Sequence, residues 1–291
     1  MGDSISGHLK ATPYKEDERP MKPKTFQPNS KLTEFVKCYW TLESEKENTP
    51  VKNTIVPDGT MKLIFHYGDT YRHYPKKRES IILPKYFLIG QLTQPYIVEP
   101  LGITGTFIVR FQPNGFLPFA TFPIKQMENT AIPLDKLFGK DGDEIGEEIL
   151  YAKSTSERIE LIETFLFNRL ADKKNIDNIV RLTVETILNA NGQFSVNELS
   201  IQNNINRRQL TRKFSSTIGL SPKQLSKIIR IQATLKSLLT DEVTSLADLA
   251  YKNEYFDQAH FIKDFKEFTG LTPKEFYGDS LKMSLIFDRE V

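Results

Sequence analysis

The chain has 291 residues, of which 39 are Lys or Arg and 37 are Asp or Glu, so its formal net charge at pH 7 is +2. This length leaves room for two domains with sizeable cores, and the 39% hydrophobic content is ordinary for a globular protein. The single cysteine, Cys38, excludes an intrachain disulfide. Because the sequence has neither a signal peptide nor an apolar run of about 18 residues, we expect a cytoplasmic protein with no membrane partner.

The first half of the chain has the pattern of a β domain. Residues 1–24 are rich in prolines and charges, and we expect a flexible leader there. From residue 25 onward, short runs alternate between apolar and polar positions, as in the run from Met61 to Tyr67 that follows the turn signal Pro57-Asp58-Gly59. Several such runs separated by Gly and Pro predict a small β barrel or sandwich, with a cupin-like barrel among the alternatives.

Helical periodicity replaces the β pattern at residues 143–170. Its main apolar stripe consists of Ile159, Ile162, Leu166 and Leu170. Leu161 and Phe165 widen this stripe, which indicates burial on two sides, against the β domain and against a second subunit. We therefore assign residues 25–172 to a β-rich sensor or dimerisation domain that ends in helices.

An all-α domain is predicted at residues 173–278, after a linker at 172–175 and before a tail at 279–291. Two stretches of this domain repeat each other 51 positions apart, from Leu210 to Lys223 and from Phe261 to Lys274. Each has an apolar pair at i, i+4, then a glycine suited to a left-handed helix end, then Ser-Pro or Thr-Pro as the start of a new helix. A short helix precedes each copy, so each repeat predicts a helix-turn-helix unit. The expected fold class is thus α+β with two domains.

The first unit carries an unusual charge distribution. Between Leu199 and Thr240 there are eight basic residues and no Asp or Glu, although the whole chain is nearly balanced. Positive charge on a helix-turn-helix unit is the footprint expected of a phosphate-binding face. The second unit, from Asp241 to Tyr277, has four lysines and eight acidic residues, a balance of 4 − 8 = −4. We therefore expect the first unit to dominate the affinity for DNA.

Residues 197–277 resemble the double helix-turn-helix domain of AraC/XylS-type transcription regulators. The matching elements are Leu199-Ser200, Leu210-Thr-Arg212-Lys-Phe214, Gly219-Leu-Ser-Pro222, Asp257-Gln-Ala-His260-Phe261, Phe265-Lys266 and Gly270-Leu-Thr-Pro273-Lys-Glu-Phe276. The sequence departs from the family pattern at Ser200, at the turn positions Asn204 and Glu254, and at Lys263, where an arginine is frequent. The resemblance implies a regulator whose front domain senses a small molecule or mediates dimerisation.

The helix from about Pro222 to Leu239 would be about 27 Å long and would hold both recognition helices on one face of the duplex, in major-groove segments about 34 Å apart. On the first recognition helix we expect Arg208, Thr211 and Arg212 to contact base edges, and Asn206, Arg207 and Lys213 to hold phosphates. On the second, Gln258, Ala259 and Lys263 are the candidates for the groove. The place of His260 in the family motif implies a phosphate or capping contact.

The front half resembles an uncharacterised β domain that often accompanies such regulators, through Cys38-Tyr-Trp40, Pro57-Asp-Gly, Leu63-Ile-Phe65, Gly90-Gln91 and Arg110-Phe-Gln-Pro113. An effector pocket is one interpretation of its aromatic residues, and a plain hydrophobic core is the alternative. Its candidate residues are Trp40, His66, Tyr67, Tyr86, Phe107 and Arg110. Arg110 alternates with Phe107, Val109 and Phe111, so it could instead be a surface charge.

No enzyme class fits the sequence. The front half offers only His66 and His73 beyond the leader, with no His-x-His pair for a metal, and there is no P-loop or Gly-rich dinucleotide turn. We therefore expect no metal and no cofactor. The candidate partners are double-stranded DNA, a small-molecule effector, RNA polymerase and a second copy of the chain. The alternative function, motivated by the acidic second unit, is a sensor or interaction protein whose helix-turn-helix pair mainly docks a protein partner.

Overall fold

A computed structural model describes residues 24–44, 51–170, 177–193, 195–202, 204–240, 246–253, 255 and 257–278. All but the last residue of the predicted leader (1–24), the whole predicted linker (172–175) and the predicted tail (279–291) lie outside these residues, as does the turn position Glu254. Among the described residues, no helix has both the length and the apolar character that a membrane span requires.

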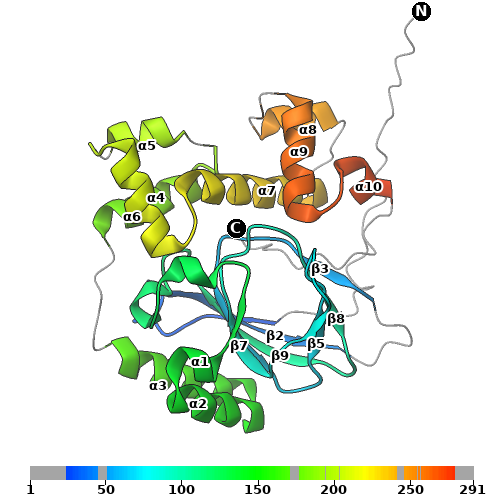
Figure 1. The fold of residues 1–291 in the computed structure, drawn as a ribbon, viewed down its shortest axis with the longest axis vertical. Helices are drawn as coiled ribbons and strands as arrows, with labels where there is room; N and C mark the ends of the chain where they lie inside the picture. Colours follow the sequence, from blue (N-terminus) through cyan, green and yellow to red (C-terminus); the bar gives the residue numbers. More distant parts are fainter. Residues whose placement is uncertain are drawn as a thin grey trace, which may run out of the picture.

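The first part of the chain forms two antiparallel sheets (Figure 1). The six-stranded sheet, in spatial order, contains β1 (Lys24–Phe26), β2 (Val36–Glu43), β9 (Gly105–Phe111), β4 (Lys62–His66), β7 (Tyr86–Ile89) and β10 (Ala131–Pro133). The four-stranded sheet contains β3 (Asn53–Ile55), β8 (Tyr96–Pro100), β5 (Tyr71–His73) and β6 (Ile81–Ile82). The predicted β-rich fold is confirmed, and its strands form two separate sheets instead of one closed barrel.

Both faces of the six-stranded sheet are buried. One face contributes Trp40, Ile64 and Ile108 to a core shared with Tyr71 and Val98 of the four-stranded sheet, so this core lies between the sheets. The other face carries aromatic and aliphatic side chains that belong to a second core, namely Tyr39, Leu63, Phe65, Leu88, Phe107, Val109 and Phe111. Strands buried on both faces explain why β4 and β9 have no exposed residue.

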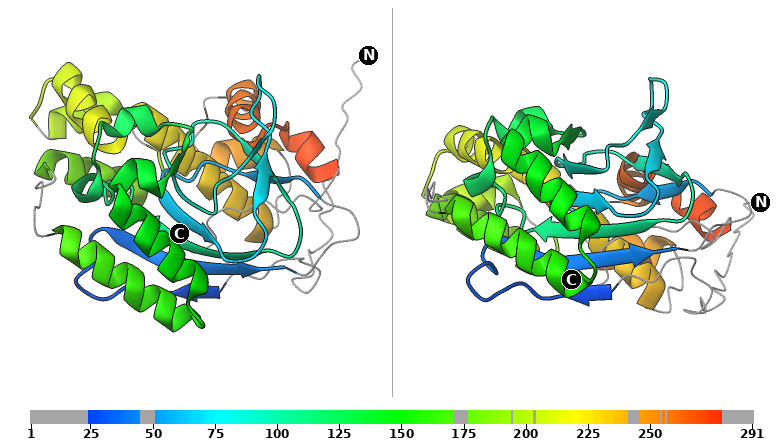
Figure 2. Two further views of the ribbon diagram at one scale, coloured as in Figure 1. Left: turned by 60° about the horizontal axis from the view of Figure 1, so that its bottom comes forward. Right: turned by 90° about the horizontal axis from the view of Figure 1, so that it is seen from below.

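Three helices cover the face of the six-stranded sheet that lies away from the four-stranded sheet (Figure 2). They are α1 (Leu134–Phe138), α2 (Lys140–Tyr151) and α3 (Thr155–Arg169). Gly146 lets α2 approach β7 closely, because a Cβ atom at this position would lie 2.6 Å from the ring of Tyr86. The helices predicted at residues 143–170 are therefore present, and Ile162 and Leu166 of their apolar stripe are fully buried.

In the second part of the chain, all regular secondary structure among the described residues is helical. Its helices are α4 (Asn178–Asn189), α5 (Val196–Gln202), α6 (Arg207–Ile218), α7 (Pro222–Thr240), α8 (Leu246–Lys252), α9 (Gln258–Thr269) and α10 (Pro273–Gly278). Two units are evident in this order, α5–α6 and α8–α9, and α7 joins them (Figure 1). The predicted pair of helix-turn-helix units with a connecting helix is confirmed.

The repeated sequence signals have repeated structural causes. Gly219 and Gly270 end α6 and α9 with φ of 87° and 82°, the left-handed geometry that glycine adopts without a Cβ clash. The backbone N–H of Gln224 then donates to Ser221 Oγ, and that of Glu275 donates to Thr272 Oγ1, each at 3.2 Å. The side chains of Gln224 and Glu275 accept hydrogen bonds in return, so each new helix begins with a reciprocal capping box.

Candidate nucleic-acid interface

The two recognition helices, α6 and α9, lie near opposite ends of α7 (Figure 1). Their N-terminal ends point away from the β domain, while their C-terminal glycines face it: Gly219 lies against Ile124, and Gly270 lies against Pro95. Recognition helices contact base edges mainly through their N-terminal residues. The ends of both helices that would enter DNA are therefore on the free side of the molecule.

The first recognition helix separates buried apolar residues from exposed basic ones. Leu210, Phe214 and Ile218 are fully buried at i, i+4 and i+8. Arg208 and Arg212 are exposed one helical turn apart, and neither has an ion-pair partner among the described residues. These two guanidinium groups can therefore reach a ligand without giving up a partner within the described part of the chain.

Of the other predicted residues of the first unit, Asn206 and Arg207 have local partners. Asn206 is the N-cap of α6, and its side chain accepts a hydrogen bond from the backbone N–H of Arg208. Arg207 is exposed and lies 3.5 Å from Asn197 Oδ1. Thr211 is half-buried. Asn206 is thus already used as a helix cap, and only its remaining polar atoms are available to a phosphate.

Lys213 is tied to the start of the helical domain. Its Nζ donates to Asp177 Oδ2 at 2.5 Å, and Asp177 is the N-cap of α4. This hydrogen bond holds the pKa of the Asp177 carboxyl below its ordinary value. Because its charge is partly compensated, Lys213 offers less net charge to a phosphate than Arg208 or Arg212.

The four predicted residues of the second recognition helix are all exposed. Gln258, Ala259 and His260 occupy its first turn, and Lys263 follows on its outer face. Asp257 caps the helix by accepting from the backbone N–H of His260 at 2.7 Å. Here the backbone of His260 is the capped group, while its ring lies 3.7 Å from Asp264.

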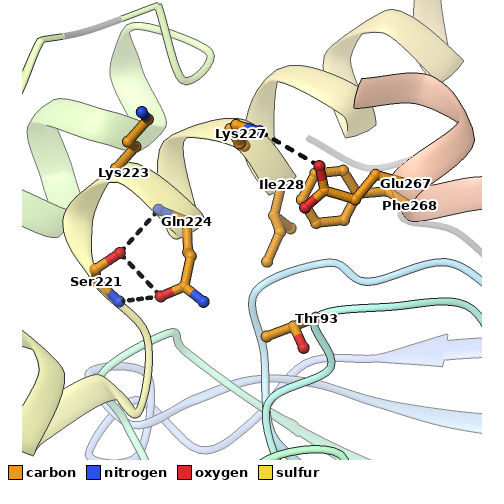
Figure 3. A pocket seen from close by; sticks show the side chains of 8 residues that line it. All are labelled: Thr93, Ser221, Lys223, Gln224, Lys227, Ile228, Glu267 and Phe268. Atoms are coloured by element: carbon orange, nitrogen blue, oxygen red, sulfur yellow. Dashed lines mark hydrogen bonds and ion pairs between the residues drawn. The ribbon is translucent and has the colours of Figure 1, made fainter. Parts of the chain in front are cut away.

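A buried ion pair fixes the second recognition helix on α7. Lys227 Nζ lies 2.8 Å from Asp264 Oδ1, and the Asp264 side chain is only 2% exposed. A second carboxylate, Glu267, lies 3.4 Å from the same ammonium (Figure 3). Burial opposes the charge of Lys227, but the hydrogen bond and charge of Asp264 outweigh it, so the pKa of Lys227 is raised. The orientation of α9 on α7 therefore depends on a lysine from the basic first half of the domain.

Several acidic residues of the second unit have structural roles. Asp257 and Glu275 cap helices, and Asp264 and Glu267 pair with Lys227. Lys252, Lys263, Lys266 and Lys274 are all exposed. The formal balance of −4 therefore overstates how acidic the unit is toward a partner.

A cavity of about 220 Å³ lies between the β domain and the helical domain (Figure 3). Thr93 faces it from a loop of the β domain, opposite Ile228 of α7 and Phe268 of α9. A larger hollow of about 620 Å³ lies beside the β5–β6 connection and is lined by His73, Tyr96 and the exposed run from Lys76 to Arg78, among others. None of the six predicted effector residues lines either space.

The six-stranded sheet divides the predicted effector residues into two groups. Phe107 belongs to the core beneath α1–α3, and Tyr67 and Tyr86 pack against that core. The Tyr67 hydroxyl donates to Glu43, and the Tyr86 hydroxyl donates to Asp143 and Glu147 of α2. These three residues therefore do not share a pocket with the other three.

Trp40, His66 and Arg110 lie on the opposite face, between the two sheets. Burial, with a smaller effect of the Lys85 charge, lowers the pKa of His66 to about 3, so its ring is neutral near pH 7. The Arg110 guanidinium stacks 3.9 Å above the Trp40 ring. Arg110 is completely buried, which shows that the surface-charge interpretation is wrong: its strand face is covered by the second sheet.

Arg110 belongs to a buried ionic cluster that the sequence alone did not reveal. Arg110 and Lys62 contact the two carboxylate oxygens of Asp58 at 2.9 and 2.8 Å, and Thr60 donates two further hydrogen bonds to it. Burial opposes ionisation of Asp58, but the charges of Lys62 and Arg110 outweigh it and hold the pKa of the carboxyl well below its ordinary value. The turn signal Pro57-Asp58-Gly59 marked the position, but nothing local in the sequence indicated its partners.

Comparison with known protein families identifies both parts of the chain. Residues 199–278 match a family described as a helix-turn-helix domain, and residues 24–133 match a domain of unknown function, DUF6597. An uncharacterized HTH-type transcriptional regulator of Staphylococcus aureus strain MSSA476 is 30% identical over 106 residues, and a regulator of the same description in strain MRSA252 matches equally. The aligned residues are 36% of this chain but only 14% of those relatives, so the chain spans a small part of their length.

Solved structures show more distant similarity. ToxT from Vibrio cholerae is 13% identical, with a TM-score of 0.44 over 89% of this chain and 98% of ToxT. The C-terminal domain of AraT, a response regulator from Geobacillus stearothermophilus, is 21% identical, with a TM-score of 0.34 over 40% of this chain and 95% of that domain. Because both TM-scores are below 0.5, no residue of this chain takes a role from either structure.

Proposed function

We propose that this chain, which carries an AraC-type helix-turn-helix domain behind a domain of unknown function, is a sequence-specific DNA-binding transcription regulator. The observation that carries the proposal is the pair of equivalent recognition helices, each with exposed polar residues in its N-terminal half and with its N-terminal end directed away from the β domain. The 19 residues of α7 separate the two units by a rod about 28 Å long, which is close to the pitch of about 34 Å between successive major-groove segments.

The proposed contacts follow from exposure and charge. Arg208, Thr211 and Arg212 contact base edges in one groove segment, where the forked guanidinium donors match guanine O6 and N7. Gln258, Ala259 and Lys263 occupy the second segment. Phosphate contacts come from Asn206, Arg207, Lys213 and His260, with a reduced contribution from Lys213 because Asp177 compensates its charge.

DNA is favoured over a protein as the main partner of the helix-turn-helix pair. The docking alternative was motivated by eight acidic residues in the second unit, and four of these serve as caps or pair with Lys227. The outward residues of α9 include Gln258 and Lys263 and no unengaged carboxylate in its first two turns. A face of this kind suits a polyanion better than a basic protein surface.

The remaining parts of the proposal concern regulation. We assign effector sensing to the layer between the two sheets, where Trp40 Nε1 and His66 Nε2 are buried with no hydrogen-bond partner among the described residues. Dimerisation through the β domain, contact with RNA polymerase, a cytoplasmic location and a non-enzymatic role complete the proposal. Each is compatible with a regulator and is open to its own test.

The experiment that tests the function is selection of random DNA duplexes on the purified full-length protein, followed by titration of the selected duplexes against salt. We expect two short enriched blocks about ten base pairs apart, because successive major-groove segments on one face of the duplex have this spacing. Affinity should fall steeply with salt, with a logarithmic slope of about −0.9 for each phosphate contact. Absence of enrichment, with weak and sequence-independent binding, would overturn direct recognition of DNA and favour the protein-docking alternative.

A further inference from the structure

The turn between β3 and β4 belongs to the β domain but packs into the helical domain. Val56 is 1% exposed and is part of the core formed by α4–α10. Gln232 Nε2 of α7 donates to the carbonyl oxygen of Pro57 at 2.7 Å. At Gly59, a Cβ atom would lie 2.5 Å from Leu225 Cδ1, so the backbone of the turn lies directly on α7. This segment is therefore one direct connection between the two domains.

The ionic cluster inside the β domain holds the same turn. Asp58, at the centre of the turn, forms ion pairs with Arg110 of β9 and Lys62 of β4. It also accepts hydrogen bonds from the backbone N–H and the hydroxyl of Thr60. Gln91 adds a hydrogen bond from its Nε2 to the carbonyl oxygen of Gly59 at 3.1 Å. If Asp58 left this cluster, the charges of Arg110 and Lys62 would remain buried without compensation, which is strongly unfavourable, so the cluster holds the turn in place.

Two further loops of the β domain contact the ends of the recognition helices. Ile124, in a 3-10 helix (Ile124–Met127), lies against Gly219 at the end of α6. Pro95 lies against Gly270 at the end of α9. The β domain thus contacts both helix-turn-helix units and the helix between them, and in Figure 1 it lies on the side opposite the N-terminal ends of α6 and α9.

We propose that the Asp58 cluster makes the β domain a brace that sets the geometry of the two recognition helices for DNA binding. This proposal rests on the proposed function. Asp58 and Arg110 act as positioning residues: they hold the turn, the turn holds α7, and the flanking loops hold the ends of α6 and α9. Docking of the domains does not cover the DNA-binding face, because Arg208, Arg212, Gln258 and Lys263 all stay exposed in the docked state. The docked arrangement is therefore compatible with DNA binding.

The test measures affinity as a function of the spacing between the two selected DNA blocks. Adding or removing one base pair shifts the second block by about 3.4 Å and rotates it by about 35°, so a rigidly braced protein should lose affinity by about tenfold or more. Asp58→Asn weakens the ionic cluster that holds the turn within the β domain. Gln232→Met removes the hydrogen bond between α7 and the turn. We expect both variants to bind the best spacing less tightly than the wild type and to discriminate among spacings by no more than about threefold.

The matched control is Arg158→Met. Arg158, in α3, is also a buried arginine of the front domain, but it donates to the carbonyl oxygens of Ile149 and Ala152 and stacks on Tyr67, away from α7. We expect Arg158→Met to lower stability while leaving the spacing profile as in the wild type. Thermal unfolding of all variants defines a temperature at which each is folded.

The outcomes separate the two proposals. A flat spacing profile in Asp58→Asn and Gln232→Met, together with a sharp profile in Arg158→Met, supports the brace. A sharp profile in all four proteins overturns it and shows that α7 alone sets the geometry. Flattening in Arg158→Met as well overturns the specific role of the Asp58 cluster. If the wild-type protein selects no duplex, the proposed function itself fails.

Discussion

At the scale of single residues, the molecule distinguishes cations that are available to DNA from cations committed to the fold. Arg208 and Arg212 are exposed and have no ion-pair partner among the described residues. Lys213, Lys227 and Arg110 belong to the same chemical class but pair with Asp177, Asp264 and Asp58. Counting basic residues along the sequence therefore overestimates the number of DNA contacts, because the partners of the committed cations are distant in the chain.

Replacing Arg212 tests the assignment of base contacts. We expect Arg212→Ala to weaken binding to the selected duplex by about 1–3 kcal/mol and to relax the preference at one base position. Lys263→Ala should cost less, because a single ammonium lacks the bidentate fork of arginine. Lys140→Ala, which removes an exposed charge from α2 in the β domain, is the control. The assignment is wrong if Lys263→Ala abolishes binding while Arg212→Ala leaves it intact.

The Asp58 cluster predicts a dependence of stability on pH. The pKa of the Asp58 carboxyl is lower in the folded chain than its ordinary value of 3.8, so its contribution is fully present above about pH 4 and is lost as the pH falls toward the folded-state pKa. The difference in unfolding free energy between the wild type and Asp58→Asn should therefore shrink as the pH is lowered from 6 to about 3. Urea unfolding at each pH measures it. A difference that stays constant or grows in acid contradicts the assignment.

At the scale of elements, the two helix-turn-helix units repeat the same local devices. Each recognition helix has an N-cap side chain, a buried apolar face, a left-handed glycine and a following Pro at the start of the next helix. These features depend on residues no more than four positions apart, which is why the sequence predicted the apolar face, the glycine and the proline. The N-caps Asn206 and Asp257 were not predicted, although they are equally local. The reciprocal role of Gln224 and Glu275 was also local, and the capping-box spacing could have revealed it.

The two cap glycines provide a matched pair of substitutions. Both have positive φ, so alanine should destabilise either position by about 1 kcal/mol through backbone strain. At Gly219 a Cβ atom would also lie 3.0 Å from Ile124, whereas at Gly270 the nearest atom, in Pro95, is 3.5 Å away. We therefore expect Gly219→Ala to lower the free energy of unfolding more than Gly270→Ala does. Equal losses of unfolding free energy, measured by urea unfolding, would show that the Ile124 side chain moves aside at no cost in stability.

At the scale of the whole molecule, the β domain and the helical domain share part of a core. Val56 lies in the helical core, and Gln232 bonds to Pro57. We expect the two domains to unfold together. The single tryptophan, Trp40, lies in the β domain, whereas most helical residues are in the second domain. The thermal transition seen by Trp40 fluorescence should therefore coincide with the one seen by circular dichroism at the helix band.

Loosening the interface should separate these transitions. Gln232→Met removes the hydrogen bond to Pro57 and is expected to shift the two signals apart, while Lys223→Met, at an exposed position on the same helix, is the control. Two transitions in the wild-type protein would mean that the domains are independent, and the brace would then lose its physical basis.

The sequence by itself determined the class of the C-terminal domain, the ends of its helices and the exposed arginines of its first recognition helix, because helix periodicity, capping and charge are local properties. It also predicted a β-rich front domain. Only the tertiary structure decided what covers each face of a strand. Alternation along β9 separates Phe107 from Arg110, but it does not tell that a second sheet covers Arg110. Likewise, the contact between Pro57 and Gln232 joins residues 175 positions apart, and no local pattern encodes such a pair.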